Sequence, residues 1–80
     1  MHWHDREQVY RQLWQRCDRL GMLKPTQQEL AAQLELPYQR LSVIMKEFQE
    51  AGFVKKFRWK FQLKDPDSLD WSRFRDRRTS

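Results

Sequence analysis

A three-residue break at positions 35–37, with the sequence Glu-Leu-Pro, separates two helical patterns and constrains the fold more than any other feature of the chain. Ahead of the break, Thr26 and Glu29 have the spacing of a capping box, in which each side chain accepts a hydrogen bond from the backbone amide of the other residue. Apolar residues then share one helical face: Leu30, Ala31 and Leu34. We therefore predict a helix over 27–34.

A second helical pattern begins directly after the break. Its apolar residues recur at helical spacing: Leu41, Ile44, Met45 and Phe48. Gly52 follows as a typical helix stop, so we predict a helix over 38–50. Two helices joined by so short a segment, with Leu36 turned inward between them, must cross at a steep angle, which is the helix-turn-helix arrangement.

An earlier helix is predicted over 5–20. Asp5 and Gln8 resemble a capping box at its start, and Gly21 is placed as its C-terminal stop. Its apolar stripe comprises Val9, Leu13, Cys17 and Leu20, widened by Tyr10 and Trp14. The connector that follows ends at Pro25, which disfavours helix at the residue before it.

After Gly52 the apolar period changes from about 3.6 residues to about 2. Apolar side chains alternate with basic or polar ones: Phe57, Trp59, Phe61 and Leu63 against Arg58, Lys60, Gln62 and Lys64. This pattern predicts a half-buried strand with a cationic outer face, and Phe53 with Val54 is expected to supply a short partner strand. We predict a hairpin over 53–64 with its turn near 56–58.

A last helix is predicted over 66–76, because Asp65 and Pro66 resemble an N-cap followed by proline at the first helical position. Its apolar residues are Leu69, Trp71 and Phe74. The fold class is therefore α+β and mainly α, with three helices, a short hairpin and this C-terminal helix in a single domain over 1–80.

The excess positive charge of the chain lies in one segment. The formal net charge is +5, and residues 53–64 carry all of it, because acidic and basic residues cancel on either side. These cations are Lys55, Lys56, Arg58, Lys60 and Lys64. A basic ribbon on a neutral body is typical of a phosphate-binding element, but lysines on an edge strand also discourage pairing with other chains. The charge alone supports both interpretations equally.

Residues 9–66 resemble the winged helix-turn-helix superfamily of bacterial and phage DNA-binding proteins. The resemblance is carried by 26–37 (TQQELAAQLELP), by Leu41, Met45 and Phe48, by 50–54 (EAGFV) and by 61–66 (FQLKDP). It implies that the 38–50 helix enters the major groove, and that the hairpin, called the wing, contacts the neighbouring backbone or minor groove. One departure is Glu35, at a turn position usually filled by glycine.

Burial of the apolar face leaves the polar face of the 38–50 helix outside. The resemblance implies that the base-reading side chains are Tyr38, Gln39, Ser42 and Val43. Gln39 can pair bidentately with adenine, and Val43 can pack on a thymine methyl group. The side chains expected on the DNA backbone are Thr26, Gln27, Arg40, Lys46, Lys55, Lys56, Arg58 and Lys60.

Other site chemistries find little support in the sequence. His2 and His4 are the only histidines, and no acidic cluster completes a metal site with them. Cys17 falls on the inner stripe of its helix, without a histidine elsewhere in the chain to activate it. Gly21 and Gly52 do not have the spacing of a phosphate-binding loop. We expect no enzyme activity, cofactor, metal, small-molecule substrate or membrane contact.

We therefore expect a double-stranded DNA-binding module located in the cytoplasm at the nucleoid. It would act in transcription control or at a replication, recombination or partition site. The alternative is a winged helix used for protein–protein contact. The aromatic surplus of Trp3, Trp14, Trp71 and Phe74 leaves a homodimer open, but packing of the first helix against the last is the favoured use.

Overall fold

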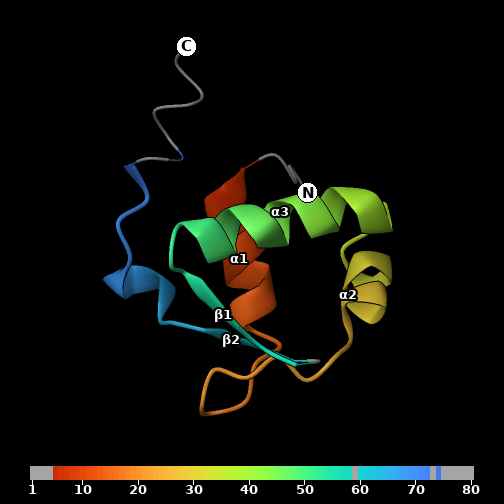
Figure 1. Ribbon diagram of the computed structural model, residues 1–80, viewed down its shortest axis with the longest axis horizontal. Helices are drawn as coiled ribbons and strands as arrows, with labels where there is room; N and C mark the ends of the chain where they lie inside the picture. Colours follow the sequence, from red (N-terminus) through yellow and green to blue (C-terminus); the bar gives the residue numbers. More distant parts are fainter. Residues whose placement is uncertain (1–4, 59, 73, 75–80) are drawn as a thin grey trace.

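The computed structural model describes residues 5–58, 60–72 and 74. Within them, three helices are followed by a two-stranded hairpin (Figure 1). In chain order the elements are α1 (Arg6–Trp14), α2 (Gln27–Gln33), α3 (Tyr38–Glu50), β1 (Val54–Phe57), β2 (Lys60–Leu63) and the short 3-10 helix η1 (Pro66–Ser68). The two strands pair antiparallel. This is the mainly helical α+β architecture of a winged helix-turn-helix domain, as the sequence predicts.

The helices on either side of the 35–37 break form as predicted, with α2 one residue shorter at its end. Both bonds of the capping box are present: Thr26 Oγ1 accepts from the Glu29 amide at 3.1 Å, and Glu29 Oε1 accepts from the Thr26 amide at 2.8 Å. The chain then turns through Glu35, whose φ of 57° lies in the left-handed region, and through the buried Leu36. α3 consequently crosses α2 at a steep angle (Figure 1).

The core lies where α1 packs beneath α3 and the hairpin. Its fully buried large side chains are Val9, Tyr10, Leu13, Leu23, Leu30, Leu41, Ile44, Met45 and Phe48. Trp71 and Phe74 complete it from the C-terminal segment, and the centre of the Trp71 ring lies 5.2 Å from that of Tyr10. Edge-to-face ring pairs of this kind contribute about 0.5–1.5 kcal/mol each beyond their burial. Trp71 and Phe74 are therefore buried inside the chain, although Trp71 lies in an irregular segment and not in the predicted last helix.

α1 ends at Trp14, so the predicted helix over 5–20 is wrong in its second half. The Asp18 carboxylate accepts hydrogen bonds from the amides of Leu20 and Met22 at 2.9 and 3.0 Å. An aspartate that bonds the local backbone in this way stabilises a turn in competition with the helix. Leu20 consequently leaves the predicted apolar stripe, and its side chain is 71% exposed.

The segment after α1 lies against β2. The Leu63 amide donates to the Gly21 carbonyl at 2.7 Å, and the Leu23 amide donates to the Phe61 carbonyl at 2.9 Å. These bonds satisfy backbone groups that would otherwise be unpaired along the edge of β2. Gly21 is thus not the predicted stop of the first helix but part of this turn, with a φ of 81°.

The hairpin covers the predicted 53–64 segment but turns later than expected. Its register runs from the pair Val54–Leu63 to the pair Phe57–Lys60, so both strands have ended before the chain reverses between Phe57 and Lys60. Arg58 has a φ of 47°, in the left-handed region. The strand predicted as continuous from Phe57 to Leu63 is therefore wrong: Phe57 ends β1 with its side chain 43% exposed. Trp59 lies outside the described residues.

The helix predicted over 66–76 is interrupted: it is not continuous after Ser68, and helical conformation returns at Ser72 and Phe74. Asp65 Oδ1 caps the first turn by accepting from the Asp67 amide at 3.0 Å, but η1 ends at Ser68. Leu69 is extended, with φ −101° and ψ 149°. The Trp71 indole then folds back and donates to the Pro66 carbonyl at 3.0 Å. The end of the predicted helix, from residue 75 onward, lies outside the described residues.

Candidate nucleic-acid interface

α3 turns one face into the core and the other away from it. The four residues predicted to read bases all lie exposed: Tyr38, Gln39, Ser42 and Val43. Tyr38 is 52% exposed and Val43 is 54% exposed. Both side chains are therefore accessible to a ligand along the outer face of the helix.

A shallow hollow lies at the start of α3, lined by Pro37, Gln39, Arg40 and Val43. Pro37 and Val43 provide apolar walls, whereas Gln39 and Arg40 bring hydrogen-bonding groups. The major-groove edge of an A·T pair presents a methyl group beside hydrogen-bonding atoms. The hollow likewise places apolar and hydrogen-bonding groups side by side.

The hairpin carries its predicted cations on both strands and at the turn, all of them exposed: Lys55, Lys56, Arg58 and Lys60. Lys55 Nζ lies 5.5 Å from the centre of the Phe57 ring, and Lys56 Nζ lies 5.9 Å from that of Phe61. Such contacts contribute about 0.5–1 kcal/mol at exposed sites. Across residues 5–58, 60–72 and 74, no carboxylate forms an ion pair with any of the four cations.

Two arginines of α1, by contrast, have acidic partners. Arg6 Nε lies 2.7 Å from Glu47 Oε1, and Arg11 Nη2 lies 2.9 Å from Asp67 Oδ1 and 3.0 Å from Glu7 Oε2. Hydrogen bonds with Asp67 and Glu7 raise the pKa of Arg11 above its ordinary value. These contacts offset the charge of α1, so the hairpin is the main source of uncompensated positive charge in the described chain.

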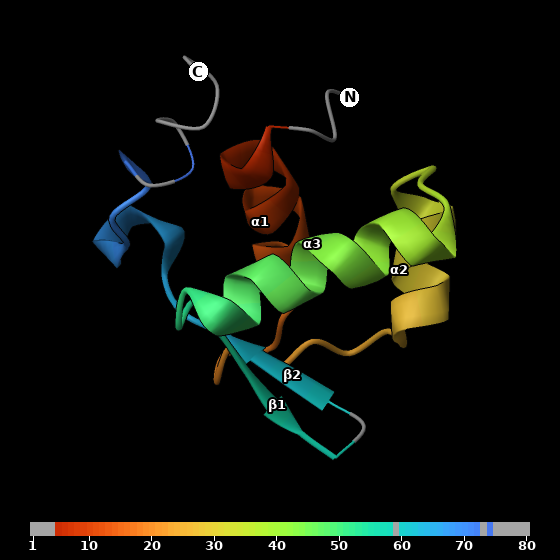
Figure 2. The same cartoon turned by 45° about the horizontal axis from the view of Figure 1, so that its top comes forward.

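The hairpin points toward the part of the fold that holds the helix-turn-helix. From its base near the end of α3, the hairpin runs toward the start of α2, whereas the first turn of α3 lies beyond the other end of α2 (Figures 1 and 2). Thr26, which is exposed, and Gln27, which is half-buried, stand at the start of α2. Arg40 and Lys46 are exposed on α3. The predicted contact residues thus come from three elements, which are α2, α3 and the hairpin.

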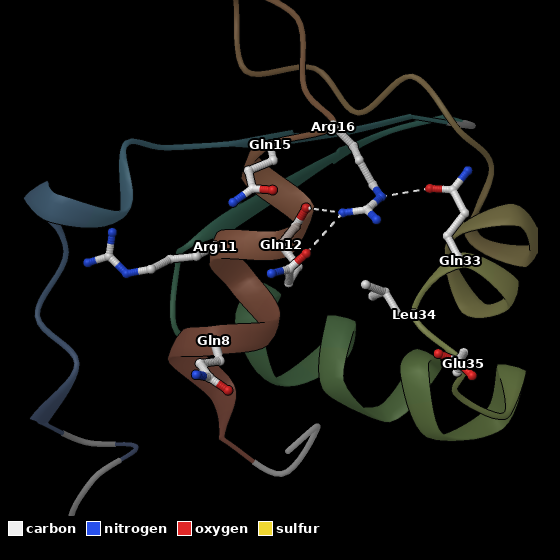
Figure 3. A pocket seen from close by; sticks show the side chains of 8 residues that line it. All are labelled: Gln8, Arg11, Gln12, Gln15, Arg16, Gln33, Leu34 and Glu35. Carbon is white, nitrogen blue, oxygen red and sulfur yellow. Dashed lines mark hydrogen bonds between the residues drawn. The ribbon is translucent and has the colours of Figure 1, made fainter. Parts of the chain in front are cut away.

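A larger hollow, which the sequence did not predict, lies between α1 and the end of α2 (Figure 3). Its lining residues are Gln8, Arg11, Gln12, Gln15, Arg16, Gln33, Leu34 and Glu35. Arg16 reaches across it, donating from Nε to Gln33 Oε1 and from Nη1 to the Gln12 carbonyl, both at 2.6 Å (Figure 3). Glutamines spaced along one face of α1 are the sequence signal for it. Both arginines that line this hollow, Arg11 and Arg16, already form hydrogen bonds within the chain. We therefore do not consider the hollow a phosphate-binding site.

The remaining candidate chemistries receive no support from the described residues. No group of three His, Cys, Asp or Glu side chains gathers there, and no helix there is long and apolar enough to cross a membrane. The Cys17 thiol donates to the Leu13 carbonyl at 3.5 Å, and burial, with a smaller effect of Asp18, raises its pKa to about 11. A thiol that stays protonated is a poor nucleophile. His2 and His4 lie outside the described residues.

Comparison with known proteins identifies the family. Residues 7–70 match the family model of the Crp-like helix-turn-helix domain. The match runs from the first turn of α1 to just beyond η1 and so includes α2, α3 and the hairpin. Searches of curated proteins and of solved structures give no match. The chain therefore belongs to the Crp-like helix-turn-helix domain family and is a helix-turn-helix DNA-binding domain.

Proposed function

We propose that this domain binds double-stranded DNA with α3 in the major groove and the hairpin on the neighbouring sugar-phosphate backbone. The observation that carries the proposal is the set of four exposed hairpin cations, none of which forms an ion pair within the described part of the chain, although Lys60 lies near enough to Asp18 to lower the pKa of that carboxyl group. They lie on a hairpin that runs toward the start of α2 (Figure 2). An edge strand that only avoids aggregation does not need to point at a helix-turn-helix. The role we infer is transcription regulation, with replication, recombination or partition as the other uses, at the nucleoid in the cytoplasm.

The outer face of α3 would read the bases. Gln39 has the donor and acceptor to pair bidentately with adenine, and the exposed Val43 would contact the methyl group of a thymine. Tyr38 and Ser42 lie on the same exposed face and would contact adjacent base edges. A good bidentate pair contributes about 1–3 kcal/mol of discrimination against the wrong base.

The backbone contacts would come from the side chains around this face: Thr26, Gln27, Arg40, Lys46, Lys55, Lys56, Arg58 and Lys60. The hydroxyl of Thr26 accepts from the Glu29 amide and keeps its own proton to donate to a phosphate oxygen. If the four hairpin cations neutralise about four phosphates, the logarithm of affinity should fall with that of salt concentration at a slope of about −3 to −4.

A titration of a random-sequence duplex at two salt concentrations tests the proposal. We expect binding at low salt that weakens steeply as salt is added. A variant with Lys55, Lys56 and Lys60 changed to Ala should lose most of this binding and slope. Arg11→Ala removes a charge that Glu7 and Asp67 already compensate, so it serves as the control and should bind as the unmodified chain does. Absence of binding at low salt would end the DNA proposal.

The alternative, a winged helix that binds another protein, is favoured by one observation: Phe57 and Leu20 are exposed apolar side chains. The aromatic side chains Trp71 and Phe74, which would also have served a partner, are buried in the core. A protein partner does not require the basic hairpin. The variant in which Lys55, Lys56 and Lys60 are changed to Ala, here called the three-lysine variant, therefore distinguishes the two functions. It should still bind a protein partner but should lose binding to DNA.

A further inference from the structure

The hydroxyl group of Tyr10, on α1, contacts both ends of the hairpin. It accepts a hydrogen bond from the Lys64 amide at 2.7 Å, and it lies 2.8 Å from the Phe53 carbonyl, to which it can donate. Phe53 directly precedes β1, and Lys64 directly follows β2. The Lys64 carbonyl lies 3.0 Å away as a second acceptor. A single side chain therefore ties the two strands to the helical body at their common base.

The ring of the same side chain contacts the recognition helix. It is fully buried, and its centre lies 5.1 Å from that of Phe48 on α3 in an edge-to-face arrangement. Phe53, at the base of the hairpin, packs on another part of the ring at 6.1 Å. Burial raises the pKa of Tyr10 to about 12. The hydroxyl is protonated at neutral pH and can donate to the carbonyl, as any tyrosine can. Tyr10 thus touches both elements that the proposed function brings to DNA.

A two-stranded hairpin is not stable alone, so its direction depends on how its base is held. β2 is also bonded to the segment after α1, through Gly21 and Leu23. In the described chain, β1 has β2 as its one strand neighbour. Its base is held from both sides of Phe53: the Phe53 amide donates to the Phe48 carbonyl of α3 at 2.9 Å, and the Phe53 carbonyl accepts from Tyr10. Loss of the hydroxyl would leave the Lys64 amide and the Phe53 carbonyl without this buried partner.

We propose that Tyr10 is a positioning residue for DNA binding, whose hydroxyl fixes the angle of the hairpin against α3 so that both contact the same duplex. This inference rests on the proposed function. Tyr10 does not itself touch DNA. It acts through the hairpin cations, and its contribution should disappear when those cations are removed.

Residual dipolar couplings of backbone amides test the geometry without DNA. Tyr10→Phe keeps the ring and removes only the hydroxyl. We expect the amides of β1 and β2 to change orientation relative to α3, or to average over several orientations, whereas those within α1 and α3 keep theirs. Val9→Ala, which removes buried volume from the adjacent α1 position with no bond to the hairpin, serves as the control and should leave the hairpin couplings unchanged. Unchanged hairpin couplings in Tyr10→Phe would overturn the inference.

A double-mutant cycle with a random-sequence duplex tests the consequence. Tyr10→Phe should bind about tenfold more weakly at low salt, with the salt slope reduced in magnitude by about 1, and Val9→Ala should keep both values. In the three-lysine background, Tyr10→Phe should cost nothing further. Equal losses in both backgrounds would contradict a role through the hairpin. If the unmodified chain binds no duplex, the proposed function fails, and the dipolar couplings still decide whether Tyr10 positions the hairpin.

Discussion

Gly21 lies so close to Leu63 that a Cβ atom on Gly21 would collide with the Leu63 carbonyl oxygen. The Leu63 amide also donates a hydrogen bond to the Gly21 carbonyl at 2.7 Å, and this bond holds the two backbone segments in contact. Gly21 also has a φ of 81°, a conformation that side-chain-bearing residues rarely adopt. The position therefore excludes a side chain for two independent reasons.

Gly21→Ala should destabilise the domain by about 2–4 kcal/mol, because the collision adds to the cost of the left-handed backbone. Gly52→Ala is the matched control: its φ is 80°, but no atom lies within 4 Å of the added Cβ, so only the backbone cost of about 1 kcal/mol applies. Urea unfolding of both variants measures the difference. Equal losses would contradict the close approach.

The contact between Gly21 and Leu63 also explains why the sequence mispredicts the end of α1. The apolar spacing from Val9 to Leu20 is helical, so periodicity alone favours a longer helix. The competing bonds come from β2, some forty residues later, and from the Asp18 carboxylate. Helix periodicity is a local signal, and a tertiary strand edge overrides it. Elements fixed by local signals, such as the capping box at Thr26, form as predicted.

The predicted C-terminal helix is interrupted after Ser68 for a similar reason. The N-cap at Asp65 is real, but the indole of Trp71 finds its acceptor at Pro66 and its packing against Phe53 only if Leu69 is extended. A buried indole requires a hydrogen-bond partner, and that demand is tertiary. The sequence pattern identifies Trp71 as apolar and inward, but it does not indicate which backbone path brings it there.

Glu35 occupies the left-handed turn position with a φ of 57°. Glu35→Gly should stabilise the domain by about 0.5–1 kcal/mol, because relief of the backbone strain exceeds the added entropy of the unfolded chain. Glu50→Gly makes the same chemical change at the end of α3, in helical conformation, and should destabilise by about 0.5–1 kcal/mol. Thermal unfolding measures the melting temperatures of both variants. If the backbone at Glu35 is strained, Glu35→Gly should raise the melting temperature and Glu50→Gly should lower it; if it is not, both should lower it.

The raised pKa of Tyr10, about 12, predicts a loss of stability at alkaline pH. An unfolded tyrosine releases its proton near pH 10, whereas the folded one keeps it, so the unfolded state binds fewer protons above pH 10. The contribution of Tyr10 is therefore complete below pH 10 and is lost as the pH rises toward 12, by on the order of 2 kcal/mol.

Comparison with Tyr10→Phe isolates this effect from other titrating groups. The difference in unfolding free energy between the two proteins should be constant from pH 7 to about 9 and should shrink between pH 10 and 12. Denaturant titrations at several pH values measure it. A difference that stays constant up to pH 12 would show that the buried hydroxyl titrates normally.

The candidate site could be predicted from the sequence to the level of faces and charges. The register of α3 follows from its apolar period, so the exposure of Gln39 and Val43 was predictable. The basic hairpin was predictable from the charge run. The place of the turn was not, because Arg58 adopts a left-handed conformation that favours glycine or asparagine. The hydrogen bonds of the Tyr10 hydroxyl involve the backbone of Phe53 and Lys64, more than forty residues later in the sequence. A pattern of side chains does not reveal such bonds.

A pair of substitutions tests whether α3 reads the bases while the hairpin contacts the phosphates. Gln39→Ala should weaken binding to the preferred duplex by about 1–3 kcal/mol and leave binding to random duplexes nearly unchanged, because a base contact contributes only at its matching base. Lys56→Ala should weaken binding to all duplexes by a similar factor and reduce the salt slope by about 1, since a phosphate contact is independent of sequence. The preferred duplex comes from selection out of a random pool, and both variants are titrated against it and against a scrambled duplex. If the two substitutions lowered affinity for both duplexes by the same ratio, α3 would not be the element that reads the sequence, even though its polar face is exposed.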